Sequence, residues 1–201
     1  MNKLFLDIET LPVEKEKHDL LKEIYDKRKD DGKSVKTYEE FLALTGLDGA
    51  FGRICCISYA INDEKPISLS GDESDILTKF WEVAQTADLF VGFNLLNFDL
   101  RFIYQRSVIH GIKPSRDLNF ARYKKDPIFD VMHEWNKWDF QSHISLDTLA
   151  KALGLPSSKG GPIEGKNVAK AYEAGLIKEI CEYCEKDVEL TRKLYYKLTF
   201  S

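Results

Sequence analysis

The order of apolar and polar positions along the chain predicts strands first and alternating helices and strands afterwards. Residues 3–8 are nearly all apolar, which is typical of a strand buried on both faces. Residues 53–61 and 67–70 predict two more strands, and the polar turn at 62–66 indicates that they form a hairpin. Apolar residues at helical spacing predict an amphipathic helix over 73–87. The remaining predicted elements are strands over 89–93 and 128–131 and helices over 98–110, 146–153, 168–174 and 177–198.

A segment of different character follows the first predicted strand. Residues 14–46 are rich in Lys, Glu and Asp, and Leu20, Leu21 and Tyr25 fall at helical spacing within them. We therefore expect a helical insertion here. The order of the other elements predicts an α/β fold, with a mixed sheet that carries helices on its faces. A length of 201 residues fits a single domain over residues 1–201.

Composition is that of an ordinary soluble domain, with 43% apolar and 31% charged residues. No apolar run approaches the ~20 residues that a membrane-spanning helix needs. The first residues contain too few apolar positions for a secretory signal. We therefore expect a cytoplasmic protein with no membrane partner.

The formal net charge of −4 does not indicate a strongly basic nucleic-acid binder. It leaves open an enzyme that grips a strand end through bound metals, because such an enzyme needs fewer cationic contacts. One local basic stretch either follows a phosphate backbone or is a solvated loop. The stretch consists of Lys113, Arg116, Arg122, Lys124 and Lys125.

The four cysteines predict ordinary buried or half-buried thiols rather than a zinc or redox site. Cys55 and Cys56 are adjacent on a predicted strand, so we expect their side chains to point to opposite faces. Cys181 and Cys184 form a single C-x-x-C within a helical pattern.

Four carboxylates in three short, mainly apolar segments are the strongest chemical signal, because an unpaired charge in such surroundings is costly. Asp7 and Glu9 lie two apart on the first predicted strand, so both side chains leave the same face. That spacing lets them share one metal ion or bridge two. A solvated strand edge is the alternative, although the residues around the pair are apolar.

The other two carboxylates lie at predicted helix positions. Asn97 is a plausible N-cap that places Asp99 in the first turn of a helix, where a negative charge is also favourable by itself. The nearby Asn94 and Phe98 suit sugar contact and base stacking. In the segment Tyr183-Cys-Glu-Lys-Asp187, the phenol and the carboxylate share one helix face, where the phenol can orient a water. A lone pair at this spacing is common by chance and gains weight only from the other segments.

Weaker candidates surround these segments. Asp130 and Asp147 could support the site, with helix capping or a surface position as the alternatives. His133 and His143 flank a Trp-rich stretch that could line a base-stacking surface, and packing against the edge of the sheet is the stronger alternative.

Together, the three acidic segments resemble the motifs of the DEDD superfamily of 3′–5′ exonucleases. Asp7-Ile-Glu9-Thr10 resembles the D-x-E motif, and Asn94-Leu-Leu-Asn-Phe98-Asp99 resembles the N-x-x-x-F-D motif. The segment from Tyr183 to Asp187 resembles the Y-x-x-x-D motif of the tyrosine-type (DEDDy) branch. The chain is most similar to predicted exonucleases related to the proofreading domain of family B DNA polymerases.

The resemblance implies a ribonuclease H-like fold and a catalytic role for each motif residue. The four carboxylates would hold two Mg²⁺ or Mn²⁺ ions, one of which activates a water while the other stabilises the leaving 3′ oxygen. Tyr183 would position the attacking water. The catalytic set implied in this way is Asp7, Glu9, Asp99, Tyr183 and Asp187. The implied substrate contacts are Thr10 and Leu11 to the terminal nucleotide and Asn94 and Phe98 to the strand end.

The leading hypothesis is a two-metal 3′–5′ exonuclease that releases nucleoside 5′-monophosphates from single-stranded ends, with DNA as the favoured substrate. A 3′–5′ exoribonuclease is the alternative within the same class. A non-catalytic nucleic-acid-binding domain is the alternative from another class, although such a domain would have no reason to keep all four carboxylates. The expected partners are a single-stranded DNA or RNA 3′ end and, for a proofreading or DNA-repair role, a polymerase or repair complex acting in trans.

Overall fold

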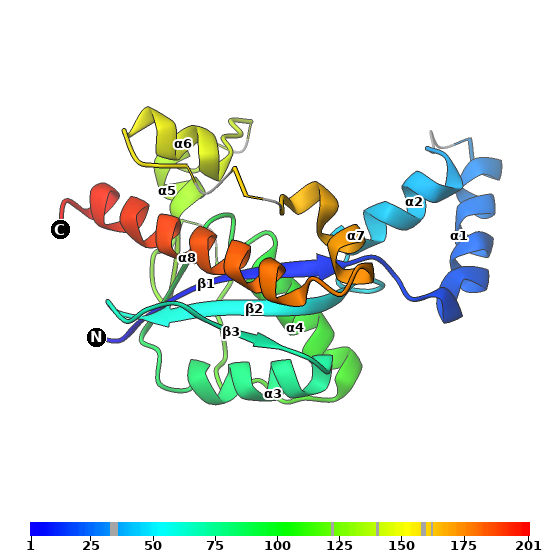
Figure 1. Ribbon diagram of the computed structural model, residues 1–201, viewed down its shortest axis with the longest axis horizontal. Helices are drawn as coiled ribbons and strands as arrows, with labels where there is room; N and C mark the ends of the chain where they lie inside the picture. Colours follow the sequence, from blue (N-terminus) through cyan, green and yellow to red (C-terminus); the bar gives the residue numbers. More distant parts are fainter. Residues whose placement is uncertain (33–35, 122, 140, 158–159, 162) are drawn as a thin grey trace.

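A five-stranded mixed sheet forms the centre of the fold (Figure 1). The structure is a computed structural model that describes all residues except 33–35, 122, 140, 158–159 and 162. The strands lie side by side in the order β3-β2-β1-β4-β5. They are β1 (Lys3–Leu11), β2 (Arg53–Ile61), β3 (Ile67–Ser70), β4 (Leu89–Gly92) and β5 (Ile128–Asp130).

The pairing of the strands gives the sheet its mixed character. β2 is antiparallel to both β1 and β3, whereas β4 is parallel to β1 and β5 is parallel to β4. β2 therefore runs opposite to the other four described strands. This arrangement confirms the predicted α/β class and the ribonuclease H-like fold.

Helices cover both faces of the sheet. The helices are α3 (Glu73–Ala84), α4 (Asp99–His110), α5 (Val131–Asn136), α6 (Leu146–Ala152), α7 (Val168–Glu173) and α8 (Ile177–Thr199). α8 is the longest and runs along β1 and β2, while α3 lies on the other side of the sheet (Figure 1). Both α8 and α3 turn an apolar stripe towards the strands. In α3 the stripe is buried as predicted and consists of Ile76, Leu77, Phe80, Trp81 and Ala84.

Alternation along β1 decides which face receives the carboxylates. Leu4, Leu6 and Ile8 pack into the core that contains α3 and α4. Phe5, one position out of phase, packs with α8 residues in a second core. Because side chains alternate between the faces of a strand, Asp7 and Glu9 share the α8 face with Phe5.

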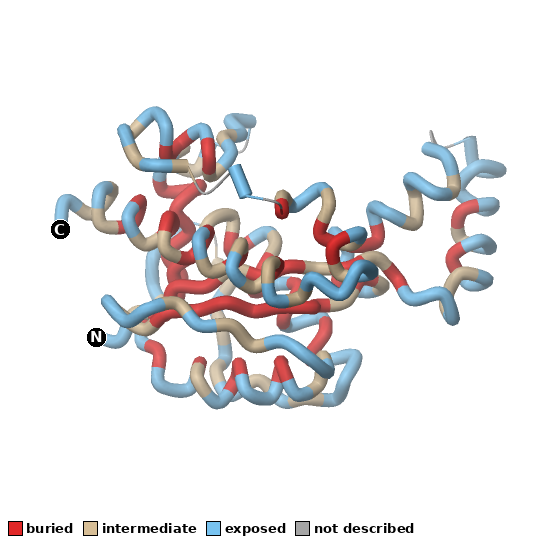
Figure 2. Tube along the Cα trace, in the orientation of Figure 1, coloured by how far each residue is buried: buried red, intermediate tan, exposed pale blue. Residues whose placement is uncertain are grey.

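The predicted helical insertion extends beyond the end of β1 (Figure 1, right). It consists of two 3-10 turns, η1 (Lys15–Lys17) and η2 (Thr45–Leu47), and two helices, α1 (His18–Asp30) and α2 (Tyr38–Leu44). The two helices are joined by an aromatic cluster in which the Tyr25 ring lies 5.3 Å from Tyr38 and 5.5 Å from Phe41. Most other positions of the insertion are exposed (Figure 2). Few of its side chains are buried, and it lies beside the end of β1.

Two differences from the predicted elements concern the surroundings of the site. β1 continues to Leu11 instead of ending at residue 8, because its pairing with β2 extends to the partners Leu11 and Arg53. Helix α5 was not predicted, and it begins directly after β5, where Asp130 accepts hydrogen bonds from the backbone N–H groups of Met132 and His133. In the described part of the chain, no helix is both long and apolar enough to cross a membrane.

Candidate active site

Strand β1 and helix α8 together form an acidic cluster on one face of the sheet. One ligand atom each from Asp7, Glu9 and Cys184 lie within 4.8 Å of one another. The Cys184 thiol donates a hydrogen bond to Asp7 Oδ2 at 3.3 Å, so α8 contacts the strand at the carboxylate itself. Asp187 lies one helical turn after Tyr183, and Asp187 is 7% exposed.

Asp99 joins this cluster from the start of α4. Its Oδ1 accepts a hydrogen bond from the backbone N–H of Ile8 at 3.1 Å. The parallel pairing of β1 with β4 covers only Lys3 to Phe5, so Ile8 lies beyond it. Asp99 thus satisfies a strand N–H that has no ladder partner on this edge, and it fixes the start of α4 against β1.

Asn97 does not cap α4, so that prediction is wrong. Phe98 precedes the helix without a side-chain hydrogen bond to it, and the Asn97 amide donates to Asn94 Oδ1 at 3.0 Å. Asp99 is nevertheless in the first helical turn, as expected. Its hydrogen bond to β1 shows that it does more than favour the start of a helix.

Electrostatic coupling ties the four carboxylates into one group. Desolvation raises the pKa of Asp7 well above its ordinary value, and the charges of Asp99, Asp187 and Glu9 raise it further. Desolvation likewise raises the pKa of Glu9, with smaller contributions from Asp187, Cys56 and Asp99. Burial raises the pKa of Asp99 to about 7. The cluster therefore resists negative charge and is suited to divalent cations, which prefer oxygen ligands.

The Tyr183 phenol completes the cluster. Its pKa is raised by desolvation and by the nearby charges of Asp187 and Glu9. The phenol is therefore protonated at neutral pH. It can donate one hydrogen bond, and its oxygen can accept one from a water.

The raised pKa values predict how the stability of the metal-free protein depends on pH. A carboxyl group with a folded-state pKa above its unfolded value, which is about 4 for Asp and Glu, stabilises the fold only while it is protonated. For Asp99, that contribution is complete below pH ~4 and is lost as the pH rises towards about 7. We expect the melting temperature in EDTA to fall between pH 5 and pH 8. Differential scanning fluorimetry tests this, with the same series in Mg²⁺ as the control. A melting temperature that is constant or rises in EDTA would contradict it.

The predicted substrate contacts lie around the cluster. The Thr10 hydroxyl donates to the backbone oxygen of Gly46 at 2.6 Å, which fastens η2 to the end of β1. Phe98 is half-buried against Phe102, with ring centroids 5.6 Å apart. Asn94 is half-buried and has a left-handed backbone with φ of 59°. All three therefore lie next to elements that carry a site carboxylate.

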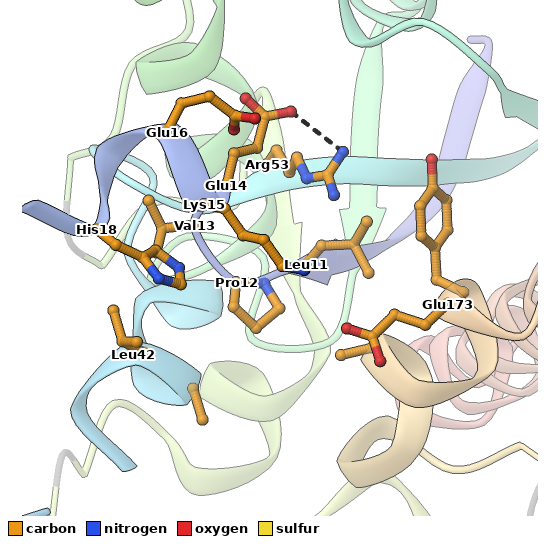
Figure 3. A pocket seen from close by; sticks show the side chains of 13 residues that line it. Leu11, Pro12, Val13, Glu14, Lys15, Glu16, His18, Leu42, Arg53 and Glu173 are labelled. Carbon is orange, nitrogen blue, oxygen red and sulfur yellow. Dashed lines mark ion pairs between the residues drawn. The ribbon is translucent and has the colours of Figure 1, made fainter. Parts of the chain in front are cut away.

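Leu11 lines a cavity of about 700 Å³ beyond the end of β1 (Figure 3). Leu11 is two residues after Glu9, a distance of about 7 Å along a strand. The walls come from β1, the insertion, β2 and α7, and they include Pro12, Leu42, Arg53 and Tyr172. Arg53 pairs with Glu14 at 3.3 Å across the cavity wall (Figure 3). The insertion thus borders a cavity whose lining begins two residues after Glu9.

Asp130 is more important to the site than the sequence indicates. Besides capping α5, its two carboxylate oxygens accept hydrogen bonds from the backbone N–H groups of Asn94 at 3.1 Å and Leu96 at 3.0 Å. One buried side chain therefore holds the loop that leads into Asp99. Its position at the end of a predicted strand was the available signal, but capping explained it equally well. His133 is buried and its ring stacks on Trp138, with ring centroids 4.9 Å apart, whereas His143 is exposed.

The expectation that Cys55 and Cys56 point to opposite faces is wrong. The pairing register shifts between Glu9 and Thr10, so that Cys55 is an extra residue on β2. Such a bulge interrupts side-chain alternation. Both thiols consequently lie in one buried cluster, which also contains Cys184. No local pattern in the sequence indicates that Cys184 contacts Asp7.

Comparison with known proteins gives a family match and a structural match. The family described as "Predicted 3'-5' exonuclease related to the exonuclease domain of PolB" matches residues 47–201. That range contains Asp99, Tyr183 and Asp187, whereas Asp7 and Glu9 precede it. The structure of the family B DNA polymerase from the hyperthermophilic archaeon Pyrobaculum calidifontis matches with a TM-score of 0.69 and 16% identity. The match covers 99% of this chain and 24% of the polymerase, and at this identity it supports the fold alone. No curated protein matched the chain.

Proposed function

Because the chain belongs to the family of predicted 3′–5′ exonucleases related to the exonuclease domain of PolB, we propose that it trims single-stranded nucleic acid from its 3′ end. The favoured substrate is DNA, and the products are nucleoside 5′-monophosphates. The observation that carries the proposal is the convergence of four carboxylates from β1, α4 and α8. Desolvation and the charges of the other three, Asp99, Asp187 and Glu9, raise the pKa of Asp7.

The donor set of the cluster fits two divalent cations. Asp7, Glu9, Asp99 and Asp187 would hold them, since four carboxylates neutralise two doubly charged ions and hard cations prefer oxygen. Bound Mg²⁺ or Mn²⁺ would supply the positive charge that activates a water and stabilises the leaving 3′ oxygen. Cys184 fixes the orientation of Asp7 by donating to its Oδ2, and Asp99 is fixed by the Ile8 N–H.

Tyr183 would position the attacking water. Desolvation and the charges of Asp187 and Glu9 raise the pKa of its phenol, so the phenol lies near the proposed metal ligands. Because the phenol is protonated at neutral pH, it would act by orienting the water rather than by removing its proton.

Residues around the cluster would hold the end of the strand. Leu11 lines the cavity next to the carboxylates and would contact the terminal nucleotide together with Thr10. The hydroxyl of Thr10 is engaged by Gly46, so Thr10 would use its methyl group or backbone. Asn94 and Phe98 would support the strand from the start of α4, where the half-buried Phe98 ring can contact a base.

The test is a trimming assay on a single strand labelled at its 5′ end, with Mg²⁺ or Mn²⁺ and with EDTA as the control. We expect a descending ladder only with metal, and a strand labelled at its 3′ nucleotide should release the label first, as a 5′-monophosphate. Parallel DNA and RNA strands decide between the two exonuclease alternatives. Binding without trimming under every metal condition would instead favour the non-catalytic domain.

A further inference from the structure

A second groove lies on the side of the molecule covered by α3 and α4. It has a volume of about 550 Å³. Its walls come from α3, α4 and the segment that follows α4, and the residues that matter below are Trp81, Arg101, Tyr104, Lys113, Arg116 and Phe120. None of them belongs to the acidic cluster or to the cavity beside Leu11.

The charge of the groove is opposite to that of the whole chain. The formal net charge of the protein is −4, yet the groove carries three cationic side chains and a single acidic one, Asp117. Among the described ion pairs, none involves Arg101, Lys113 or Arg116. Arg116 donates a long hydrogen bond of 3.5 Å to the backbone oxygen of Gln85. These positive charges are therefore available to a negatively charged ligand.

Aromatic rings accompany the charges. Tyr104 is 49% exposed on α4, and Phe120 is half-buried in the segment after it. Trp81 forms the floor, since it is buried and its indole N–H donates to Ser107. Cationic groups beside accessible rings are what single-stranded nucleic acid requires, because phosphates bind the former and bases stack on the latter.

The groove accounts for part of the basic stretch that the sequence contains. Lys113 and Arg116 line it, whereas Lys125 pairs with the buried Glu134 at 2.8 Å and is thus engaged elsewhere. Arg122 lies outside the described residues. The stretch therefore divides into a part that lines the groove and a part that does not.

Helix α4 connects the groove to the proposed active site. The helix begins with Asp99, which is buried against β1, and its exposed side carries Arg101 and Tyr104. Tyr104 is five residues after Asp99, a rise of about 7.5 Å along the helix. The carboxylates of β1 face α8 and the groove lies on the other side of the sheet, so a strand whose 3′ end lay at the carboxylates would reach the groove by passing around the start of α4.

We propose that this groove binds the single strand a few nucleotides before its 3′ end. Tyr104 and Phe120 stack on bases, and Arg101, Lys113 and Arg116 contact phosphates. The proposal rests on the proposed exonuclease function and adds a binding site to it. The site sets affinity for long strands and takes no part in hydrolysis.

The test measures strand binding without hydrolysis. Fluorescence anisotropy of a 12-nucleotide DNA strand is followed in the Asp7→Asn background with Mg²⁺. Arg101→Gln with Lys113→Gln should weaken binding and reduce the slope of log K against log salt by about 1.4, since each phosphate contact on a single strand contributes about 0.7. Tyr104→Ser should weaken binding about 5- to 150-fold, as expected for the loss of one base–aromatic stack.

The control makes the same change of charge elsewhere, with Lys27→Gln and Lys29→Gln on exposed positions of α1. It should leave the slope at the value of the parent protein. If the groove variants also leave the affinity and the salt slope unchanged, the proposal is wrong. That result is the one expected of a groove that binds an acidic peptide instead of nucleic acid.

A small substrate separates this proposal from the proposed function. Groove variants with Asp7 intact should hydrolyse the p-nitrophenyl ester of thymidine 5′-monophosphate at the wild-type rate, because it is too small to reach the groove. A parallel loss with this substrate would overturn the proposal. If the wild type hydrolyses neither the ester nor a strand, the exonuclease function fails, while the anisotropy result still decides whether the groove binds nucleic acid.

Discussion

Asp7→Asn is expected to abolish trimming of a single strand and, at the same time, to stabilise the metal-free protein. Asp7 lies among Glu9, Asp99 and Asp187, and desolvation together with their charges raises its pKa. A neutral amide removes both penalties in the folded state. It also removes a proposed ligand of the metals that would supply several kcal/mol to the transition state, so we expect a rate loss of at least about 10³-fold.

Two measurements on the same samples test this prediction. The single-turnover trimming rate should fall below detection. The melting temperature in EDTA at pH 8 should rise by about 2–4 °C for each kcal/mol of repulsion relieved. Asp75→Asn is the matched control, because it makes the same change at an exposed position in the first turn of α3; it should leave the trimming rate unchanged and should not raise the melting temperature.

Added Mg²⁺ provides a third readout that does not depend on activity. A ligand that binds only the folded state raises the melting temperature. We expect Mg²⁺ or Mn²⁺ to stabilise the wild type and to have a much smaller effect on Asp7→Asn. A variant that trimmed normally, or that responded to metal as the wild type does, would show that Asp7 is not a metal ligand.

The local chemistry of the sequence predicts the elements that carry the site. The strands at 53–61 and 67–70 agree with β2 and β3 at both ends, because apolar residues on either side of a polar turn define them locally. The shared face of Asp7 and Glu9 follows from the period of a strand. The third contributor, α8, is indicated by the spacing of Tyr183 and Asp187 on a helix, taken together with the other acidic segments.

What the sequence does not predict depends on contacts between distant segments. Asp130 holds the Asn94 loop through backbone N–H groups 34 and 36 residues away, which no local pattern reveals. The shift in register beside Glu9 reverses the expected direction of one cysteine, because a bulge is set by strand pairing. Asn97 is a good N-cap by residue type, yet its amide bonds to Asn94 instead. In each case tertiary hydrogen bonding overrides local preference.

Tyr183→Phe is expected to lower kcat about 10²-fold while leaving KM for a single strand nearly unchanged. The substitution keeps the ring in its packed position and removes only the hydroxyl, which lies near the charge of Asp187. If that hydroxyl orients the attacking water, its loss affects the transition state and not substrate binding, and positioned groups of this kind contribute about 10² or more. Steady-state kinetics on a strand of fixed length measure the two constants separately.

The choice of control separates water positioning from a structural role. Tyr196→Phe near the other end of α8 removes a hydroxyl that donates to Asp63, outside the acidic cluster and the cavity beside Leu11, and should leave kcat unchanged. The stabilisation of Tyr183→Phe by Mg²⁺ should match that of the wild type, because all four carboxylates remain. A parallel loss of metal stabilisation would instead mean that the phenol acts by holding Asp187 in place. Full activity would remove Tyr183 from the mechanism and leave the carboxylates to orient the water through the metals alone.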